Sequence, residues 1–182
     1  MMRILAFGLF FLFLSSTTFA QEPEPFDFKG MALGSDASSV EGTSRFHCGD
    51  PKSPIADRSC SLRYDVKETI AGAPVQGLSL YYYSGKLETI RITVDQRNFS
   101  QVAAALAEKY GEGAVRTETV HNRMGAAFEN AIYSWRRGTA TLEARRYSGK
   151  LDTSLVTYRT DFGVAEFERR RGPAAKEKAK DL

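Results

Sequence analysis

One heptapeptide occurs twice in this 182-residue chain with a single change: YSGKLET at residues 83–89 returns as YSGKLDT at residues 147–153, an offset of 64. The same offset relates three further pairs, Arg45 with Lys109, Phe46 with Tyr110 and Leu78 with Leu142. Similarity at a fixed interval indicates a duplicated supersecondary unit. We therefore expect an α+β fold with two tandem units, each a helix followed by antiparallel strands. Together they would form one sheet packed against helices.

The segments around each copy predict the elements of these units. A turn at Gly34 with a capping residue after it predicts a helix from Ser35 towards Phe46. Val102, Leu106 and Tyr110 recur at helical spacing and predict a second helix from Asn98 or Ser100 to a stop at Gly111. Alternating apolar and polar residues predict strands at 78–83, 87–94, 115–120, 131–136, 139–147 and 153–159.

The two predicted hairpins allow a choice of register. A two-residue loop would place apolar residues opposite polar ones, whereas a three-residue loop separates them onto two faces. The second choice predicts four pairs, Leu80 with Ile90, Leu78 with Ile92, Leu142 with Val156 and Ala140 with Tyr158. One face of the sheet is then apolar in both units.

The other face of the predicted sheet is rich in tyrosine and arginine. It carries Ser79, Tyr81, Tyr83, Thr89 and Arg91 from the first unit and Thr141, Glu143, Arg145, Tyr147, Thr157 and Arg159 from the second. Tyrosine and arginine are enriched in protein interfaces because they bury a large area and keep a polar end. The candidate binding residues here are Tyr81, Tyr83, Arg91, Arg145 and Tyr147. The alternative is a solvated face, or one covered by the helices or the tail.

Trp135 is the centre of one aromatic and basic cluster. Tyr133 lies two residues before it, and Arg136 and Arg137 follow. A tryptophan in such a strand belongs to the core in the default interpretation, and a ligand-stacking site is the alternative. Trp135 is therefore a further candidate binding residue.

Cys48 and Cys60 are the only cysteines in the chain. An isolated pair that closes a short loop predicts a disulfide if the protein reaches an oxidising compartment. The alternative is a metal site of Cys48, Cys60 and His47, but a closed zinc site needs four ligands and no second Cys/His pair exists. We expect no metal and no cofactor.

No motif for catalysis is present. The sequence Ser84-Gly85-Lys86 and its repeat resemble a serine nucleophile with a lysine base, but a duplicated hairpin turn explains both copies. His47 and His121, the only histidines, are expected at the surface rather than in acid–base roles. An enzyme is therefore the alternative hypothesis, namely a small hydrolase with a pocket near Trp135 and His121.

The first twenty residues have the pattern of an export signal. Arg3 is followed by an apolar stretch from Ile4 to Leu14 and by a small-residue run that ends at Ala20, where we expect cleavage. The apolar stretch is too short to span a membrane, which takes roughly twenty residues. No cysteine stands directly after the cleavage point to carry a lipid. We therefore expect a periplasmic or secreted protein without a membrane span.

The rest of the chain divides into three parts. Residues 21–25 read as a flexible lead, 26–162 as one α+β domain and 163–182 as a charged, disordered tail. The formal net charge of +3 is made of interspersed charges of both signs, and no nucleic-acid partner is expected.

The segment FKGMALG at residues 28–34, ahead of a predicted helix and hairpin, resembles the start of small exported proteobacterial proteins. The tandem layout is similar to the β-lactamase-inhibitor-protein fold, which small outer-membrane assembly lipoproteins of the SmpA/BamE type share. The resemblance implies a non-enzymatic module that binds another envelope or secreted protein. An envelope stability or stress factor without a single ligand is a further alternative.

Overall fold

The structure is a computed structural model that describes residues 24–51 and 55–178. The expected signal, residues 1–20, and most of the expected lead lie outside the described residues. The described chain is an α+β fold with one nine-stranded antiparallel sheet in the order β3-β4-β6-β7-β11-β10-β9-β8, to which β5 is joined through β6. No helix in the described residues is long and apolar enough to cross a membrane.

The strands are β1 (Asp27–Phe28), β2 (Met31–Ala32), β3 (Phe46–Gly49), β4 (Arg58–Leu62), β5 (Thr69–Ile70), β6 (Ala73–Tyr83), β7 (Lys86–Asp95), β8 (Ala114–His121), β9 (Ala127–Arg137), β10 (Ala140–Arg145) and β11 (Thr153–Thr160). The α-helices are α1 (Phe99–Tyr110) and α2 (Asp161–Lys178), and two short 3₁₀ turns span Ala37–Ser39 and Gln96–Asn98.

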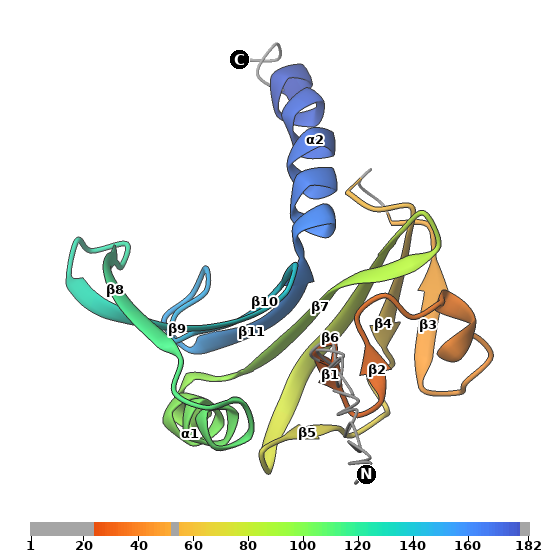
Figure 1. Ribbon diagram of the computed structural model, residues 1–182. Coiled ribbons are helices and arrows are strands. Elements are labelled where there is room, and N and C mark those ends of the chain that lie inside the picture. The colour runs from red at the N-terminus through yellow and green to blue at the C-terminus, as the bar shows by residue number, and fades with distance from the viewer. Residues whose placement is uncertain (1–23, 52–54, 179–182) are drawn as a thin grey trace, which may run out of the picture.

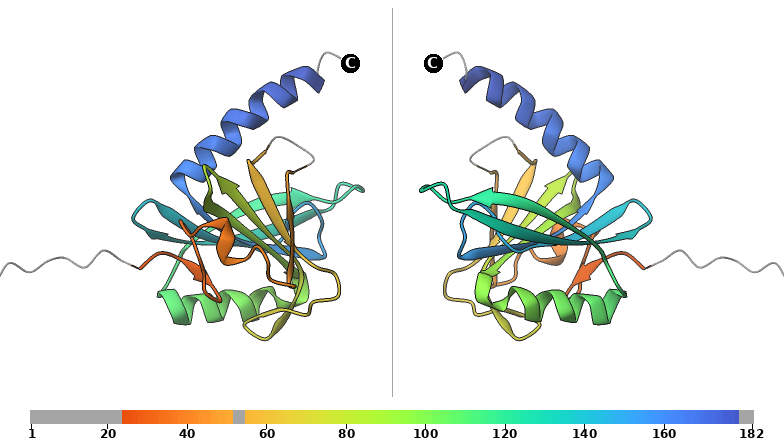
Figure 2. Two further views of the ribbon diagram at one scale, coloured as in Figure 1. Left: turned by 90° about the vertical axis from the view of Figure 1, so that its right-hand side faces the viewer. Right: turned by 90° about the vertical axis from the view of Figure 1, so that its left-hand side faces the viewer.

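The sheet is strongly curved, with α1 on one side and α2 rising from the other (Figure 1). Figure 2 shows the same arrangement from two further sides, with α1 below the sheet and α2 above it. The core lies on the side of α1. It joins the apolar faces of the central strands to Val102 and Leu106 of α1 and to Phe26 and Met31 near β1 and β2. The opposite, concave face carries the polar residues.

The predicted register of the first hairpin is confirmed, because Leu78 pairs with Ile92 and Leu80 with Ile90. The turn itself is tighter than expected. Tyr83 pairs with Lys86, and the extra residue is Glu88, in a bulge between the Tyr81 and Tyr82 pairs. Glu88 restores the segregation of the two faces that a plain two-residue turn would lose.

The predicted register of the second hairpin is wrong by two residues. Leu142 pairs with Tyr158, and Ala144 pairs with Val156. The cause is the connection, which runs from the end of β10 at Arg145 to the start of β11 at Thr153 and holds the first six residues of the repeated heptapeptide outside these two strands. A shift by two keeps every side chain on its predicted face, so the apolar side remains buried.

The helix predicted from Ser35 to Phe46 is also wrong. This segment contains only the short turn Ala37–Ser39, and β3 begins at Phe46. Gly42 has a φ of 83°, which ends any helical continuation, and Phe46 pairs with Leu62 in the sheet. The second predicted helix is confirmed as α1, with Gly111 at a φ of 84° after its last residue. Phe46 and Tyr110, related by the offset of 64, therefore differ in structure, and the tandem units stay a prediction.

Cys48 and Cys60 form a disulfide, as predicted. The two residues are directly opposite each other on β3 and β4. The bond therefore fixes the edge strand β3 to its only neighbour in the sheet order.

The chain continues as α2 where the sequence predicts a disordered tail from residue 163. The first turns of α2 pack closely on the sheet. A Cβ added to Gly163 would lie 2.8 Å from the carbonyl oxygen of Glu88. Phe167 and Arg170 lie along one face of α2 and also point towards the sheet.

Candidate ligand-binding groove

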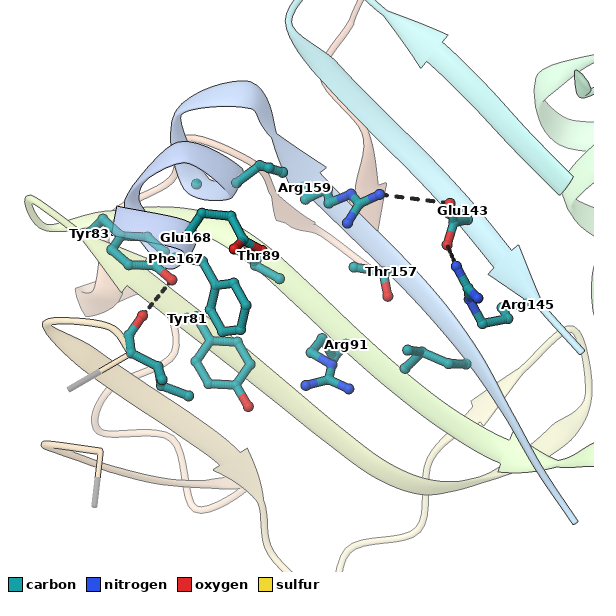
Figure 3. A pocket seen from close by; sticks show the side chains of 14 residues that line it. Tyr81, Tyr83, Thr89, Arg91, Glu143, Arg145, Thr157, Arg159, Phe167 and Glu168 are labelled. Atoms are coloured by element: carbon teal, nitrogen blue, oxygen red, sulfur yellow. Dashed lines mark hydrogen bonds and ion pairs between the residues drawn. The ribbon is translucent and has the colours of Figure 1, made fainter. Parts of the chain in front are cut away.

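A groove of about 290 Å³ lies on the concave face, between the sheet and the first turns of α2. Its floor comes from β6, β7, β10 and β11, and one wall comes from α2 (Figure 3). These strands are adjacent in the sheet although two of the floor residues, Tyr81 and Arg159, are 78 positions apart in the chain. The groove combines apolar and charged side chains, which is typical of small-ligand sites.

Four of the six predicted binding residues line this groove, namely Tyr81, Tyr83, Arg91 and Arg145. They come together because neither the bulge in the first hairpin nor the two-residue shift of register in the second moves a side chain to the other face of the sheet. Thr157 and Arg159 of the same predicted face also line it. The polar face of the sequence analysis is thus one concave surface in the structure.

Trp135 does not belong to the groove, and its interpretation as a binding residue is wrong. It is only 5% exposed and forms part of the core on the side of α1. Its Nε1 donates a hydrogen bond to the carbonyl oxygen of Gly111 at 2.6 Å, and its ring stacks with Tyr133 at 6.4 Å. The default interpretation as a core tryptophan is therefore the correct one.

Tyr147 also lies outside the groove. It lines a separate, open hollow with His121, Arg123 and Lys150 at the ends of the β8–β9 and β10–β11 connections. The cause is again the long second connection, which removes Tyr147 from the ladder.

Sequence reasoning missed the wall that α2 provides. Val164, Phe167 and Glu168 line the groove beside the buried Gly163. A signal was present, because Gly163, Phe167 and Arg170 recur at spacings of four and three residues, as one face of a helix requires. The surrounding run of charges hid this pattern.

Tyr83 and Arg170 fix α2 against the sheet. The Tyr83 hydroxyl donates a hydrogen bond to the carbonyl oxygen of Ile55 at 2.6 Å. The Arg170 guanidinium lies 5.1 Å from the centre of the Tyr83 ring and 2.8 Å from Asp57 Oδ1. A backbone N–H of Ser84 and then Arg170 lower the pKa of Asp57, while burial raises the pKa of Tyr83. Tyr83 is only 2% exposed, so it supports the wall rather than reaching a ligand.

A buried carboxyl group lies under the start of α2. Glu88, 9% exposed, accepts a hydrogen bond from the Thr160 hydroxyl. The same hydroxyl oxygen accepts a hydrogen bond from the Gly163 N–H at 2.9 Å. Burial raises the pKa of Glu88, and the Thr160 hydrogen bond opposes that shift.

The floor of the groove contains a network of charges around Glu143. Its carboxylate oxygens lie 3.2 Å from Arg145 Nη2, 3.7 Å from Arg159 Nη2 and 3.5 Å from Arg116 Nη2. Arg145 is also paired with Glu118. Each of these arginines therefore has a carboxylate partner within the protein.

Arg91 differs from the other arginines of the groove. It is exposed, and Figure 3 shows it beside Tyr81 with no interaction drawn to it. Within the part of the chain that the structure describes, Arg91 has no carboxylate partner. Its charge is thus available to a ligand.

The structure does not assemble the chemistry of the enzyme alternative. His47 is exposed on β3 and His121 is exposed on β8, the two opposite edges of the sheet. Trp135 is buried on the face away from the groove. Ser84 and Lys86 lie at the exposed turn, where Lys86 Nζ pairs with Asp36 at 2.9 Å.

The metal alternative finds no support in the geometry. Among the described residues, one group of possible ligands has its atoms within 4.8 Å of one another, namely Glu41, Cys48 and Cys60. The two sulfur atoms are bonded to each other, so they are not thiolate ligands. Glu41 is paired with Arg58, and His47 is not part of the group.

Comparison with family models, with curated proteins and with solved structures finds no match to this chain.

Proposed function

We propose that this chain is an exported binding protein that takes its ligand or partner in the concave groove. The observation that carries the proposal is the groove's composition. Tyr81 and Arg91 of the first hairpin, Arg145 and Thr157 of the second, and Phe167 of α2 line one hollow. Aromatic and guanidinium groups together provide contact area and directed hydrogen bonds, which binding sites need.

Two features support export. Residues 1–20 have the pattern of a signal peptide. The Cys48–Cys60 disulfide is compatible with an oxidising compartment such as the periplasm or the exterior. The proposed site of action is therefore the cell envelope or the medium.

We further propose that the sheet arose by duplication of one hairpin unit. The supporting geometry is the pairing of β7 with β11, where Ile92 is directly opposite Val156, its counterpart at the offset of 64. An antiparallel pair of equivalent strands related by a two-fold axis would show this arrangement. Groove residues then come in equivalent pairs, Tyr81 with Arg145 and Arg91 with Leu155.

A groove-filling variant tests the binding proposal. Thr157→Trp places a large ring on the floor, while Thr119→Trp adds the same ring to an exposed position on β8, on the face opposite the groove. The full chain and both variants would be used to capture material from the envelope fraction of the source cell, followed by mass spectrometry of proteins and small molecules. Material bound by the wild type and by Thr119→Trp should be lost with Thr157→Trp.

The proposal is wrong if Thr157→Trp retains the same material as Thr119→Trp. Thermal unfolding of each variant checks that the fold is intact. Should Thr157→Trp unfold early, Tyr81→Ala provides a second test, because Tyr81 is half-buried in the groove and, among the described residues, makes no hydrogen bond to α2. Tyr147→Ala is its matched control outside the groove.

A further inference from the structure

The Arg91 guanidinium, which has no carboxylate partner among the described residues, has two hydroxyl neighbours. Arg91 is directly opposite Ser79 on β6 and directly opposite Thr157 on β11. Side chains opposite each other in an antiparallel pair share one face, with Cβ atoms about 5 Å apart. One positive charge with five N–H donors is therefore flanked on both sides by a hydroxyl group.

This arrangement favours an oxyanion. A guanidinium binds a carboxylate or phosphate through two parallel N–H···O hydrogen bonds, and hydroxyl groups can donate to the same oxygen atoms. A cation would be repelled by Arg91, and a neutral group would leave its charge without a partner. The other two arginines of the groove, Arg145 and Arg159, already share Glu143.

Apolar side chains of the remaining lining accept an apolar body, while the carboxylate of Glu168 lines the α2 wall beside them. Tyr81 lies beside Arg91. Leu155 is two residues before Thr157 in the chain and lies on the same face of β11. Phe167 faces the floor from α2 (Figure 3), and Val164 of the same helix also lines the groove. The volume of about 290 Å³ is at the small end of ligand pockets, which run from roughly 300 to 1,000 Å³.

We propose that the groove binds a small amphipathic oxyanion, with its head on Arg91 and Thr157, next to Ser79 at the position opposite Arg91, and its apolar body against Tyr81, Leu155 and Phe167. This inference rests on the proposed function and specifies the class of ligand. The head is a carboxylate or a phosphate monoester, and the body is a short alkyl chain or one aromatic ring.

Titration calorimetry of the disulfide-bonded chain with four probes tests the inference. Octanoate and octyl phosphate carry the two heads on the same chain, octyl glucoside is neutral and octyltrimethylammonium is cationic. Both anions should bind more tightly than the neutral and cationic probes by at least tenfold. Whichever of the two anions binds more tightly identifies the head group that the site prefers.

Arg91→Gln should weaken binding of the anions by about ten- to a hundredfold, the effect of losing charge-assisted hydrogen bonds. Arg123→Gln removes the same charge from an exposed position in the β8–β9 connection and should leave binding unchanged. Arg91→Lys should lose less than Arg91→Gln, because it keeps the charge.

Equal binding of octanoate and octyl glucoside, or an Arg91→Gln variant that binds like the wild type, would overturn the inference. So would a lack of binding by all four probes. The proposed function is tested separately, because the Thr157→Trp capture experiment does not depend on the chemistry of these probes.

Discussion

The two copies of the heptapeptide have nearly the same sequence and different structures. In the first copy, Ser84 and Gly85 form a tight turn with positive φ angles of 50° and 79°, and Tyr83 is buried against α2. In the second copy, the same letters lie in an open connection between β10 and β11, and Tyr147 lies beside a surface hollow.

One buried amide accounts for the difference. The Asn130 side chain is fully buried; its Oδ1 accepts a hydrogen bond from the Tyr147 N–H at 2.7 Å, and its Nδ2 donates to the Tyr147 carbonyl at 3.1 Å. The residue 64 positions earlier is Val66, which has no amide to offer. Local sequence thus allows a tight turn in both copies, and one tertiary contact keeps the second copy out of the ladder.

The largest expected effect on stability comes from the Cys48–Cys60 disulfide, which lies in the first of the two sequence repeats and has no counterpart in the second. The positions equivalent to Cys48 and Cys60 are Glu112 and Met124, so the second half has no disulfide. Reduction should lower the free energy of unfolding by about 3 kcal/mol, the value for a loop of this length. Denaturant unfolding with and without reductant measures it. Amide exchange should rise first in β3 and β4; a rise that begins in β10 and β11 would contradict the comparison.

Asn130→Val introduces the first copy's residue into the second. Two backbone groups of Tyr147 lose their partners, and Glu118 loses the hydrogen bond that it accepts from Asn130 at 3.0 Å. We expect a loss of about 2 kcal/mol in the free energy of unfolding. The control is Asn98→Ala, since the Asn98 side chain makes no capping hydrogen bond. Equal effects of the two changes would show that the Asn130 contacts do not hold the second connection.

The two copies also differ at the sixth position of the heptapeptide, where the carboxyl group is buried in one copy and exposed in the other. Glu88 is buried in the bulge, and its counterpart Asp152 is exposed. Because burial raises the pKa of Glu88, the folded state keeps a proton that the unfolded state releases, and stability falls as pH rises above 4.5. Glu88→Gln should therefore raise the free energy of unfolding at pH 7 and flatten its decline with pH.

Asp152→Asn is the matched control and should change neither quantity. Urea unfolding between pH 4 and pH 8 compares the two variants. A Glu88→Gln variant that keeps the wild-type pH dependence would show that this carboxyl group is not the source of it.

The smallest expected effect lies in the turns. Ser84 has a positive φ, which a serine adopts with strain, whereas Ser148 is not among the described residues with positive φ. Ser84→Asn creates an Asn-Gly turn and should stabilise the protein by about 0.5 kcal/mol. Ser148→Asn should have no measurable effect. Thermal unfolding of both variants measures the difference, and an equal gain from both would mean that the two turns are alike.

Much of the sheet could be predicted from the sequence, because alternation of apolar and polar residues fixes which face each side chain takes. The pairing of Leu80 with Ile90 followed from this alone, and so did the group of Tyr81, Arg91 and Arg145 on one surface. The Cys48–Cys60 bond followed from there being no other cysteine. The second helix followed from the spacing of Val102 and Leu106 and the stop at Gly111.

The errors have particular physical causes. The register of the second hairpin depends on the hydrogen bond between Asn130 and Tyr147. These residues are 17 positions apart, and such a contact leaves no periodic pattern in the sequence. The helix expected from Ser35 was ended by Gly42 and by the pairing of Phe46 in the sheet. The wall of the groove was missed because the charged residues of α2 outnumber Phe167 and its apolar neighbours.

The concave groove as the binding site is the central claim, and amide chemical shifts test it most directly. The ¹⁵N-labelled chain would be titrated with an extract of the envelope of its source cell. The account predicts shifts at Tyr81, Arg91, Thr157 and Phe167, with residues of β8 unchanged. Shifts confined to the hollow of His121 and Lys150, with the groove unaffected, would contradict it.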